Sequence, residues 1–190
     1  NKLLRKTGHI SKIKILNQNN KMMIDSSTIR NLEIFDSIQN QTHDGTLIKI
    51  IDKTITASGS RLLKQRLRQP LVDISKIQNR YKLVESFIKN ESIRNNVTNH
   101  LKEVDDIERI LSKISSLKSN PRDLKQLAIS LNKIDKIKNQ FHKSTSTFIK
   151  ISQEILDLSN IVNEINKIII DEPPITISKG RFVKKGFSKK

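Results

Sequence analysis

Few residues of this chain have side chains and spacing suited to catalysis. Asp105, Asp106 and Glu108 place three carboxylates in one short stretch, a pattern that can serve acid–base chemistry. The same residues are typical of the acidic first turn of a helix, where the helix dipole stabilises negative charge. We favour this second interpretation because it is the simpler one. Arg109, which follows, is expected either to pair with a carboxylate inside a helix bundle or to face solvent.

Metal binding and phosphate binding are predicted to be absent. His100 and Glu103 can share one helical turn, but a metal site needs a third ligand and none is evident in the sequence. The chain has no cysteine, which excludes disulfides and thiolate metal sites. Gly59, Ser60 and Arg61 lack the spacing and the lysine of a phosphate-binding loop. Gly59 is instead interpreted as a helix-start glycine that permits close packing. We therefore expect no catalytic, cofactor-binding or metal-binding residue, and no ATP turnover by this chain alone.

Composition narrows the classes of function further. The formal net charge of the 190 residues is +17, which favours association with a polyanion. A general excess of Lys, Ile and Asn, as an AT-rich genome produces, explains much of that charge. Aromatic residues make up only 4%, so stacking on nucleic-acid bases is not expected. No apolar run reaches membrane-spanning length and no signal-peptide pattern is present, so we expect a piece of a longer cytosolic protein with no membrane partner.

Helical periodicity dominates the elements that must position these residues. Between residues 45 and 73 the pattern predicts helix, break and helix, with Thr56 as the cap of the second helix and Pro70 after its end. Asp73 is expected to cap the next helix, and Asn120 with Pro121 marks another helix start. The apolar stripes predicted to face the core are Leu62, Leu63 and Leu67; Ile74, Ile77, Tyr81, Val84 and Ile88; Val104, Ile107, Leu111 and Ile114; Leu124, Leu127, Leu131 and Ile134; and Ile151, Ile155, Leu158, Val162, Ile165 and Ile169.

Short strands are expected only near the two ends of the chain. Residues 9–15 alternate apolar and polar side chains, and residues 22–24 suggest a partner strand. Residues 175–177 and 181–183 suggest a second hairpin with its turn at Gly180. The predicted fold class is therefore mainly α: a multi-helix core bundle with short β-hairpins near the N-terminus and the C-terminus.

Five stretches, in the same order, resemble the MutS family of DNA mismatch-recognition proteins. They are residues 22–34 with Arg30 and Asn31; residues 45–73 with Gly59, Ser60, Arg61, Leu62, Leu63, Pro70 and Leu71; residues 104–111 with Asp106, Glu108 and Arg109; the helix start Pro121, Arg122 and Asp123; and Pro173 and Pro174 before a glycine hairpin. In that hairpin Phe187 stands where the family usually has Tyr. The resemblance implies that these residues have structural roles in the first part of the core and lever domain, domain III.

The resemblance also implies a layout and a function. Residues 1–20 would close the connector region, residues 21–172 would form the helical core, and residues 173–190 would lead toward the lever helix. The segment would be a mechanical link between the DNA clamp and the ATPase domain, with no catalytic site of its own. The alternative is an independent, non-specific nucleic-acid-binding helical domain driven by its net positive charge.

For the full-length parent the resemblance implies a DNA-dependent ATPase that uses ATP and Mg²⁺. That parent would be a dimer in the bacterial cytoplasm, at the nucleoid, and would meet mismatched duplex DNA through its other domains. Within this chain, Lys184, Lys185, Lys189 and Lys190 are weak candidates for contact with the DNA backbone, since no acidic residue follows Glu172. Lysines on all faces would favour the mechanical link, and lysines gathered in one groove would favour direct binding.

Overall fold

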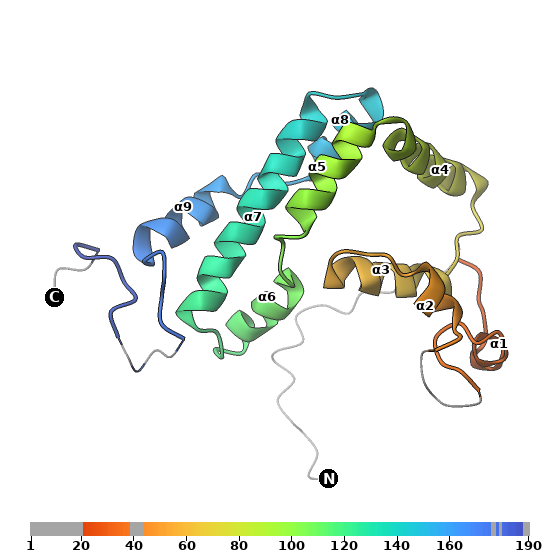
Figure 1. The fold of residues 1–190 in the computed structure, drawn as a ribbon, viewed down its shortest axis with the longest axis horizontal. Coiled ribbons are helices and arrows are strands. Elements are labelled where there is room, and N and C mark those ends of the chain that lie inside the picture. Colours follow the sequence, from red (N-terminus) through yellow and green to blue (C-terminus); the bar gives the residue numbers. More distant parts are fainter. Residues whose placement is uncertain (1–20, 39–43, 176–177, 179, 188–190) are drawn as a thin grey trace, which may run out of the picture.

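A computed structural model describes residues 21–38, 44–175, 178 and 180–187 (Figure 1). Helices dominate these residues and no β-sheet forms among them, which confirms the mainly α prediction. The helices are α1 (Ser26–Asn31), α2 (Leu47–Ile51), α3 (Ala57–Arg68), α4 (Ile74–Lys89), α5 (Glu91–Leu101), α6 (Ile107–Ser115), α7 (Pro121–His142), α8 (Ser146–Glu154) and α9 (Ser159–Ile168).

Helices α1, α2 and α3 form a small N-terminal lobe with its own core. Ile34, Phe35 and Ile48 are buried, and Leu63 and Leu67 of α3 pack against them. The guanidinium of Arg68 lies 4.6 Å from the centre of the Phe35 ring, a cation–π contact that covers the core at this edge. Leu62, predicted to share the buried edge of α3, is instead 45% exposed.

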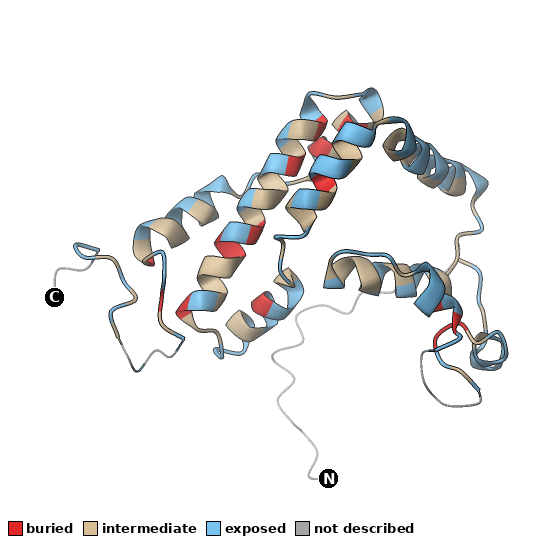
Figure 2. Cartoon of the chain, viewed as in Figure 1, coloured by how far each residue is buried: buried red, intermediate tan, exposed pale blue. Residues whose placement is uncertain are grey.

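Helices α4 to α9 form a bundle around the long helix α7, which packs against α5, α6, α8 and α9 (Figure 1). Its core contains Val97, Ile137, Phe141 and Phe148, and Figure 2 shows buried positions along α7 and on the helices next to it. The predicted stripe from residue 151 to residue 169 is divided between two helices, because the chain leaves the helix after Glu154 and re-enters it at Ser159.

The predicted inner face of α4 is wrong. Tyr81, Val84 and Ile88 are 69%, 56% and 66% exposed, whereas Leu83 and Phe87 pack against the bundle core. Helix α4 carries apolar side chains on both of these faces, so periodicity alone did not show which face the bundle would cover.

The predicted hairpins are not present in the described residues. Residues 9–15 lie outside them, and Lys21 forms an isolated bridge with Leu71, beyond the end of α3. At the other end Val183 pairs with Ile169, and the Ile170 N–H donates to the Phe182 carbonyl at 3.1 Å. Residues 182–184 thus meet the end of α9, and residues 176 and 177 of the predicted partner strand lie outside the described residues. The short apolar stretches at 175–177 and 181–183, with a turn glycine at Gly180 between them, had suggested that these two stretches pair with each other.

Candidate functional site, two polar junctions between distant segments

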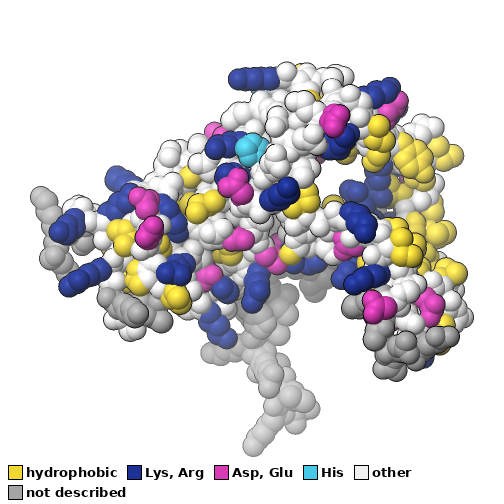
Figure 3. Space-filling view, in the orientation of Figure 1, with side chains coloured by type: hydrophobic (Ala, Val, Ile, Leu, Met, Phe, Trp, Pro, Cys, Tyr) yellow, Lys and Arg dark blue, Asp and Glu magenta, His cyan; other side chains and the backbone are white. Residues whose placement is uncertain are grey.

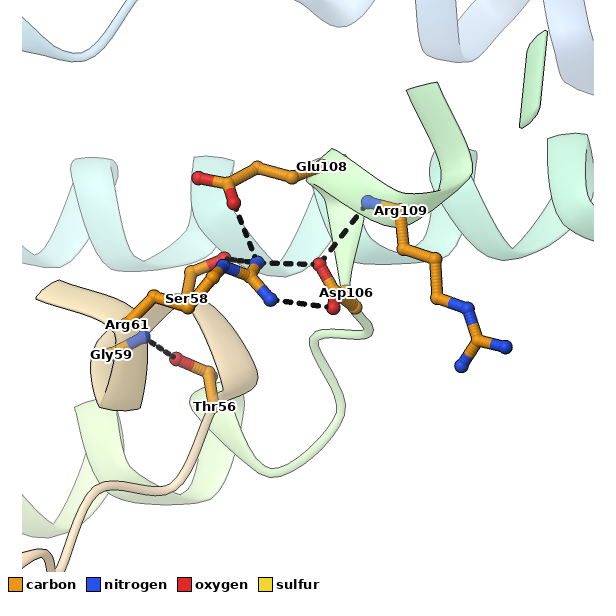
Figure 4. Close-up of polar contacts among 7 residues, drawn as sticks. All are labelled: Thr56, Ser58, Gly59, Arg61, Asp106, Glu108 and Arg109. Carbon is orange, nitrogen blue, oxygen red and sulfur yellow. Dashed lines mark hydrogen bonds and ion pairs between the residues drawn. The ribbon is translucent and has the colours of Figure 1, made fainter. Parts of the chain in front are cut away.

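The first junction joins α3 of the N-terminal lobe to the start of α6 (Figure 4). Arg61 binds Asp106 through both guanidinium nitrogens, with Nη1–Oδ2 at 2.9 Å and Nη2–Oδ1 at 2.7 Å. Its Nη2 also lies 2.7 Å from Glu108 Oε2 and donates to Ser58 Oγ at 3.1 Å. One guanidinium therefore holds two carboxylates from a segment that is 45 residues further along the chain.

Arg61 lies in the first turns of α3, and a side-chain cap fixes where that helix begins. The Thr56 hydroxyl accepts the Gly59 N–H at 3.1 Å, as the sequence predicted for this helix start. A Cβ atom at Gly59 would lie 3.1 Å from Thr56 Oγ1 and 3.3 Å from Thr54 Cβ, so a side chain there would crowd the cap. The geometry agrees with the interpretation of Gly59 as a close-packing position. The next residue, Ser60, donates its hydroxyl to Asp52 at 2.6 Å and ties α3 to the end of α2.

The Asp106 carboxylate of the first junction caps a helix and binds Arg61, and it is a poor base. Asp106 caps α6 by accepting the Arg109 N–H at 3.2 Å, and Glu108 lies in the first helical turn, so the helix-start interpretation is confirmed. The hydrogen bond from Arg61 lowers the pKa of Asp106 to about 2 and raises the pKa of Arg61. A carboxylate with that pKa holds no proton near neutral pH and accepts one weakly, which argues against acid–base chemistry here.

Arg109 takes the solvent-facing alternative. Its backbone N–H contributes to the cap, but its guanidinium points away from Asp106 and Glu108 (Figure 4). The side chain is exposed. Burial acts to raise the pKa of Asp123, but hydrogen bonds from Lys113 and the Asn120 N–H, together with the charges of Lys113 and Arg109, lower it. Arg109 is therefore a neighbour of the first junction and not one of its ion pairs.

The second junction joins the start of α7 to the segment after α9. Asn120 and Asp123 form a reciprocal capping box, and Pro121 occupies the first turn, as the sequence predicted. Arg122 Nε donates to the carbonyl of Pro173 at 2.8 Å, and Pro173 is buried. The Arg122 hydrogen bond joins segments that lie 51 residues apart.

Two lysines complete this region. Lys125 Nζ donates to Asn166 at 2.8 Å and to Asp171 at 2.7 Å, and Lys113 of α6 donates to Asp123 at 2.7 Å. Sequence reasoning missed Lys113 and Lys125, because nothing distinguishes them among the many lysines of this chain. The only sequence signal for these two lysines was their position about one helical turn after a motif residue, Arg109 for Lys113 and Arg122 for Lys125.

The other motif residues lie outside the two junctions. Arg30 and Asn31 are exposed at the end of α1, the Pro70 carbonyl accepts the Met22 N–H at 2.8 Å, and Leu71 bridges to Lys21. Pro174 is half-buried beside Pro173. The Lys184 N–H donates to the Ile168 carbonyl at 2.8 Å and Lys185 is exposed, whereas Lys189 and Lys190 lie outside the described residues.

Charged side chains are distributed over the surface and do not gather in one groove on the visible face. Lys and Arg lie over most elements in Figure 3, with Asp and Glu between them. In the part of the chain that the structure describes, no three His, Asp or Glu side chains are grouped to hold a metal ion. Nor is any helix there both long and apolar enough to span a membrane.

We expect acid to destabilise the fold in a defined pH window. Hydrogen bonds lower the pKa values of Asp25, Asp52 and Asp106 from 3.8 to about 2, chiefly those from Ser27, Ser60 and Arg61. A carboxylate whose pKa is lower in the folded state stabilises that state above the unfolded pKa and loses this effect as the pH falls. Urea midpoints should therefore decrease between about pH 5 and pH 2. Asp52→Asn should reduce that dependence, with Asp44→Asn as the exposed control.

The two junctions bring four of the motif stretches together in pairs, and comparison with known proteins agrees with the motifs. The family model of MutS domain III matches residues 27–185. The chain belongs to the MutS family. It is 36% identical over 185 residues to the DNA mismatch repair protein MutS of Halothermothrix orenii, and the match covers 97% of this chain and 21% of that protein.

Two further MutS relatives give the same picture. The DNA mismatch repair protein MutS of Caldanaerobacter subterraneus is 37% identical over 190 residues, covering 98% of this chain and 22% of that protein. The MutS of Clostridioides difficile is 35% identical over 183 residues, and the match covers 96% of this chain and 19% of that protein. The chain thus spans about one fifth of the length of the MutS proteins that it matches.

Proposed function

We propose that this chain is the core segment of a mismatch-repair MutS protein and links its DNA clamp mechanically to its ATPase domain. The observation that supports this most directly is the pairing of distant motif stretches at the two polar junctions. Arg61 meets Asp106 and Glu108, and Arg122 meets the carbonyl of Pro173. These residues connect elements that lie far apart in the sequence.

The first junction suits a part that transmits motion. No helix of the N-terminal lobe packs extensively against a helix of the bundle within the described chain, whereas α7 packs closely with four others. Two parts with separate cores that share a small charged contact can rotate about that contact. Arg61 is placed to hold one relative orientation of the lobe and bundle and to release it when another orientation is favoured.

The alternative, an independent nucleic-acid-binding domain, receives less support. Its motivation is the net charge of +17. On the face in Figure 3 the cations are dispersed among acidic side chains and form no continuous stripe. Phe87, Phe141 and Phe148 pack on each other in the bundle core and are not platforms for bases.

The remaining parts of the proposal follow from the family. We place residues 1–20 at the end of the connector, residues 21–172 in the core of domain III, and residues 173–190 toward the lever. The parent would be a dimeric, cytoplasmic, nucleoid-associated ATPase that uses ATP and Mg²⁺ and binds mismatched duplex DNA through its other domains. We assign no catalytic role to this chain.

The proposal is tested by Arg61→Ala in the full-length parent. We expect ATP binding and DNA binding, measured separately, to stay near wild type. The change in mismatch affinity on adding ATP should shrink by about 2- to 30-fold, because residues along a coupling path modulate it by about 0.5–2 kcal/mol. The measurement is a titration of labelled mismatched duplex with and without ATP.

Arg109→Ala is the matched control, since it removes the neighbouring guanidinium that points away from the junction. The proposal fails if Arg61→Ala leaves the nucleotide effect unchanged, or if Arg109→Ala reduces it equally.

A further inference from the structure

A short linker, residues 69–73, joins the N-terminal lobe to the bundle by connecting α3 to α4 (Figure 1). The two parts have separate hydrophobic cores, and no lobe helix packs extensively on a bundle helix within the described chain. The ion pairs of Arg61 with Asp106 and Glu108 bridge them at the side. When that junction is open, the conformation of the linker therefore decides how the lobe and the bundle are oriented.

Two residues before α1 are fastened to this linker. The Met22 N–H donates to the Pro70 carbonyl at 2.8 Å, and Lys21 forms an antiparallel bridge with Leu71. The Lys21 ammonium also donates to Gln69 Oε1 at 2.6 Å, in a partly buried contact. Residues 21–22 thus hold three consecutive residues of the linker, and we call this arrangement the clip.

The clip moves with the lobe and not with the bundle. From Met22 the chain continues directly into α1, whose N-cap is Asp25. Ile29 of α1 packs against the lobe core of Ile34, Phe35 and Ile48. The clip therefore fastens the first half of the linker to the lobe.

A closed clip leaves little of the linker free to turn. Proline fixes its own φ, and the clip restrains Pro70 and Leu71 from outside. At the far end Asp73 belongs to α4, because its carboxylate caps that helix by accepting the Lys76 N–H at 3.2 Å. Val72, which is 52% exposed, is the residue left between the two restrained ends. Rotation of packed parts is typically absorbed by a few such residues, so opening the clip would extend the hinge from Val72 to Leu71 and Pro70.

We propose that residues 21–22 form a clip that limits the rotation of the lobe against the bundle once the Arg61 junction opens. This rests on the proposed function, in which the two parts change orientation. While Arg61 holds Asp106 and Glu108, the junction keeps the orientation and the state of the clip matters little. After release, the clip confines the hinge and sets the range of orientations that the lobe can reach.

The test is a distance measurement in the full-length parent, with neither ATP nor DNA present. Nitroxide labels are attached at Gln65→p-acetylphenylalanine in α3 and Asn95→p-acetylphenylalanine in α5, two exposed positions on opposite sides of the linker. Excess unlabelled protein restricts double electron–electron resonance to distances within one polypeptide. The readout is the ratio of the main lobe–bundle distance to all other distances, measured with Arg61 intact and in the Arg61→Ala background.

Met22→Pro removes the N–H that binds Pro70, while Lys21 before it already has the extended backbone that a following proline favours. In the Arg61→Ala background the ratio should fall by about 2- to 12-fold, the population change for loss of one hydrogen bond. With Arg61 intact the fall should be smaller, because two restraints on one motion are not additive.

Met23→Pro is the matched control. Met23 is 83% exposed and its N–H forms no hydrogen bond within the described residues, so the ratio should stay within about twofold. Lys21→Met is a second test that keeps every backbone N–H and removes only the donor to Gln69. It should lower the ratio in the Arg61→Ala background, and it decides the matter if circular dichroism shows that Met22→Pro unfolds the lobe.

The proposal is overturned if folded Met22→Pro leaves the distances of the Arg61→Ala protein unchanged, or if Met23→Pro changes them equally. An effect that is just as large with Arg61 intact would also overturn it, as would an unchanged ratio in Lys21→Met. These distances are measured without nucleotide, so failure here remains distinct from failure of the nucleotide effect that tests the proposed function.

Discussion

Phe148→Ala is expected to lower the free energy of unfolding by about 3–5 kcal/mol, the usual cost of removing a buried phenylalanine. Phe148 is 0% exposed. Its ring meets Phe87 edge-on with centroids 4.8 Å apart and stacks on Phe141 at 5.1 Å. The substitution therefore removes two ring contacts and leaves a cavity where α4, α7 and α8 meet.

The measurement is thermal unfolding followed by circular dichroism. For a chain of this size about 1 kcal/mol corresponds to 2–4 °C, so a decrease in Tm of roughly 6–20 °C is expected. Phe187→Ala is the matched control because the same side chain is 49% exposed there, and its Tm should stay close to wild type. Equal Tm values for the two variants would contradict the assignment of the bundle core.

Local features of this fold were predictable from the sequence, and their physical reason is short range. Thr56, Asp73 and Asn120 cap α3, α4 and α7 as predicted, since a capping side chain bonds to an N–H only three residues away. The end of α3 before Pro70 was likewise set by the local clash of proline with the residue before it.

Features that depend on distant partners were not predictable in the same way. The motif residues were identified through the family resemblance, but the sequence did not show that Arg61 meets Asp106 and Glu108, or that Arg122 meets Pro173. Helix α4 has apolar side chains on two faces, and only one of them packs on the bundle. The face predicted to be buried, with Tyr81, Val84 and Ile88, is the exposed one. At the C-terminal end Val183 pairs with Ile169, because backbone groups at the end of α9 have no partner within the helix. The sequence had suggested residues 175–177 as the partner of this stretch.

The net charge leads to the second large effect, which concerns DNA. A chain with a formal charge of +17 should associate weakly with any duplex at low salt, through release of counterions from the phosphates. Each phosphate neutralised adds about 0.9 to the slope of log affinity against log salt. Dispersed cations touch few phosphates of one straight duplex at a time. With about four contacts, affinity should fall by about 100-fold between 50 and 200 mM salt.

Lys184 and Lys185 are the described members of the candidate DNA-contacting group, and they can be tested against lysines elsewhere. Changing both to Gln should reduce the salt slope by about 1–2 if they contact phosphates. Lys143→Gln with Lys150→Gln removes the same charge from exposed positions near α8 and should change the slope less. Equal effects of the two pairs would mean that only the total charge matters, and would remove the C-terminal lysines as a site.

Mismatch preference is the measurement that separates the mechanical link from direct reading of DNA. We expect micromolar or weaker binding at low salt, loss of binding near physiological salt, and equal affinity for a mismatched duplex and its matched twin. The physical reason is that phosphate contacts carry no sequence information, while the bundle's clustered aromatic rings are buried in its core. Titration of both labelled duplexes at two salt concentrations provides the comparison. A reproducible preference for the mismatch by this chain alone would show that it reads DNA itself, and its assignment as a mechanical link would have to be abandoned.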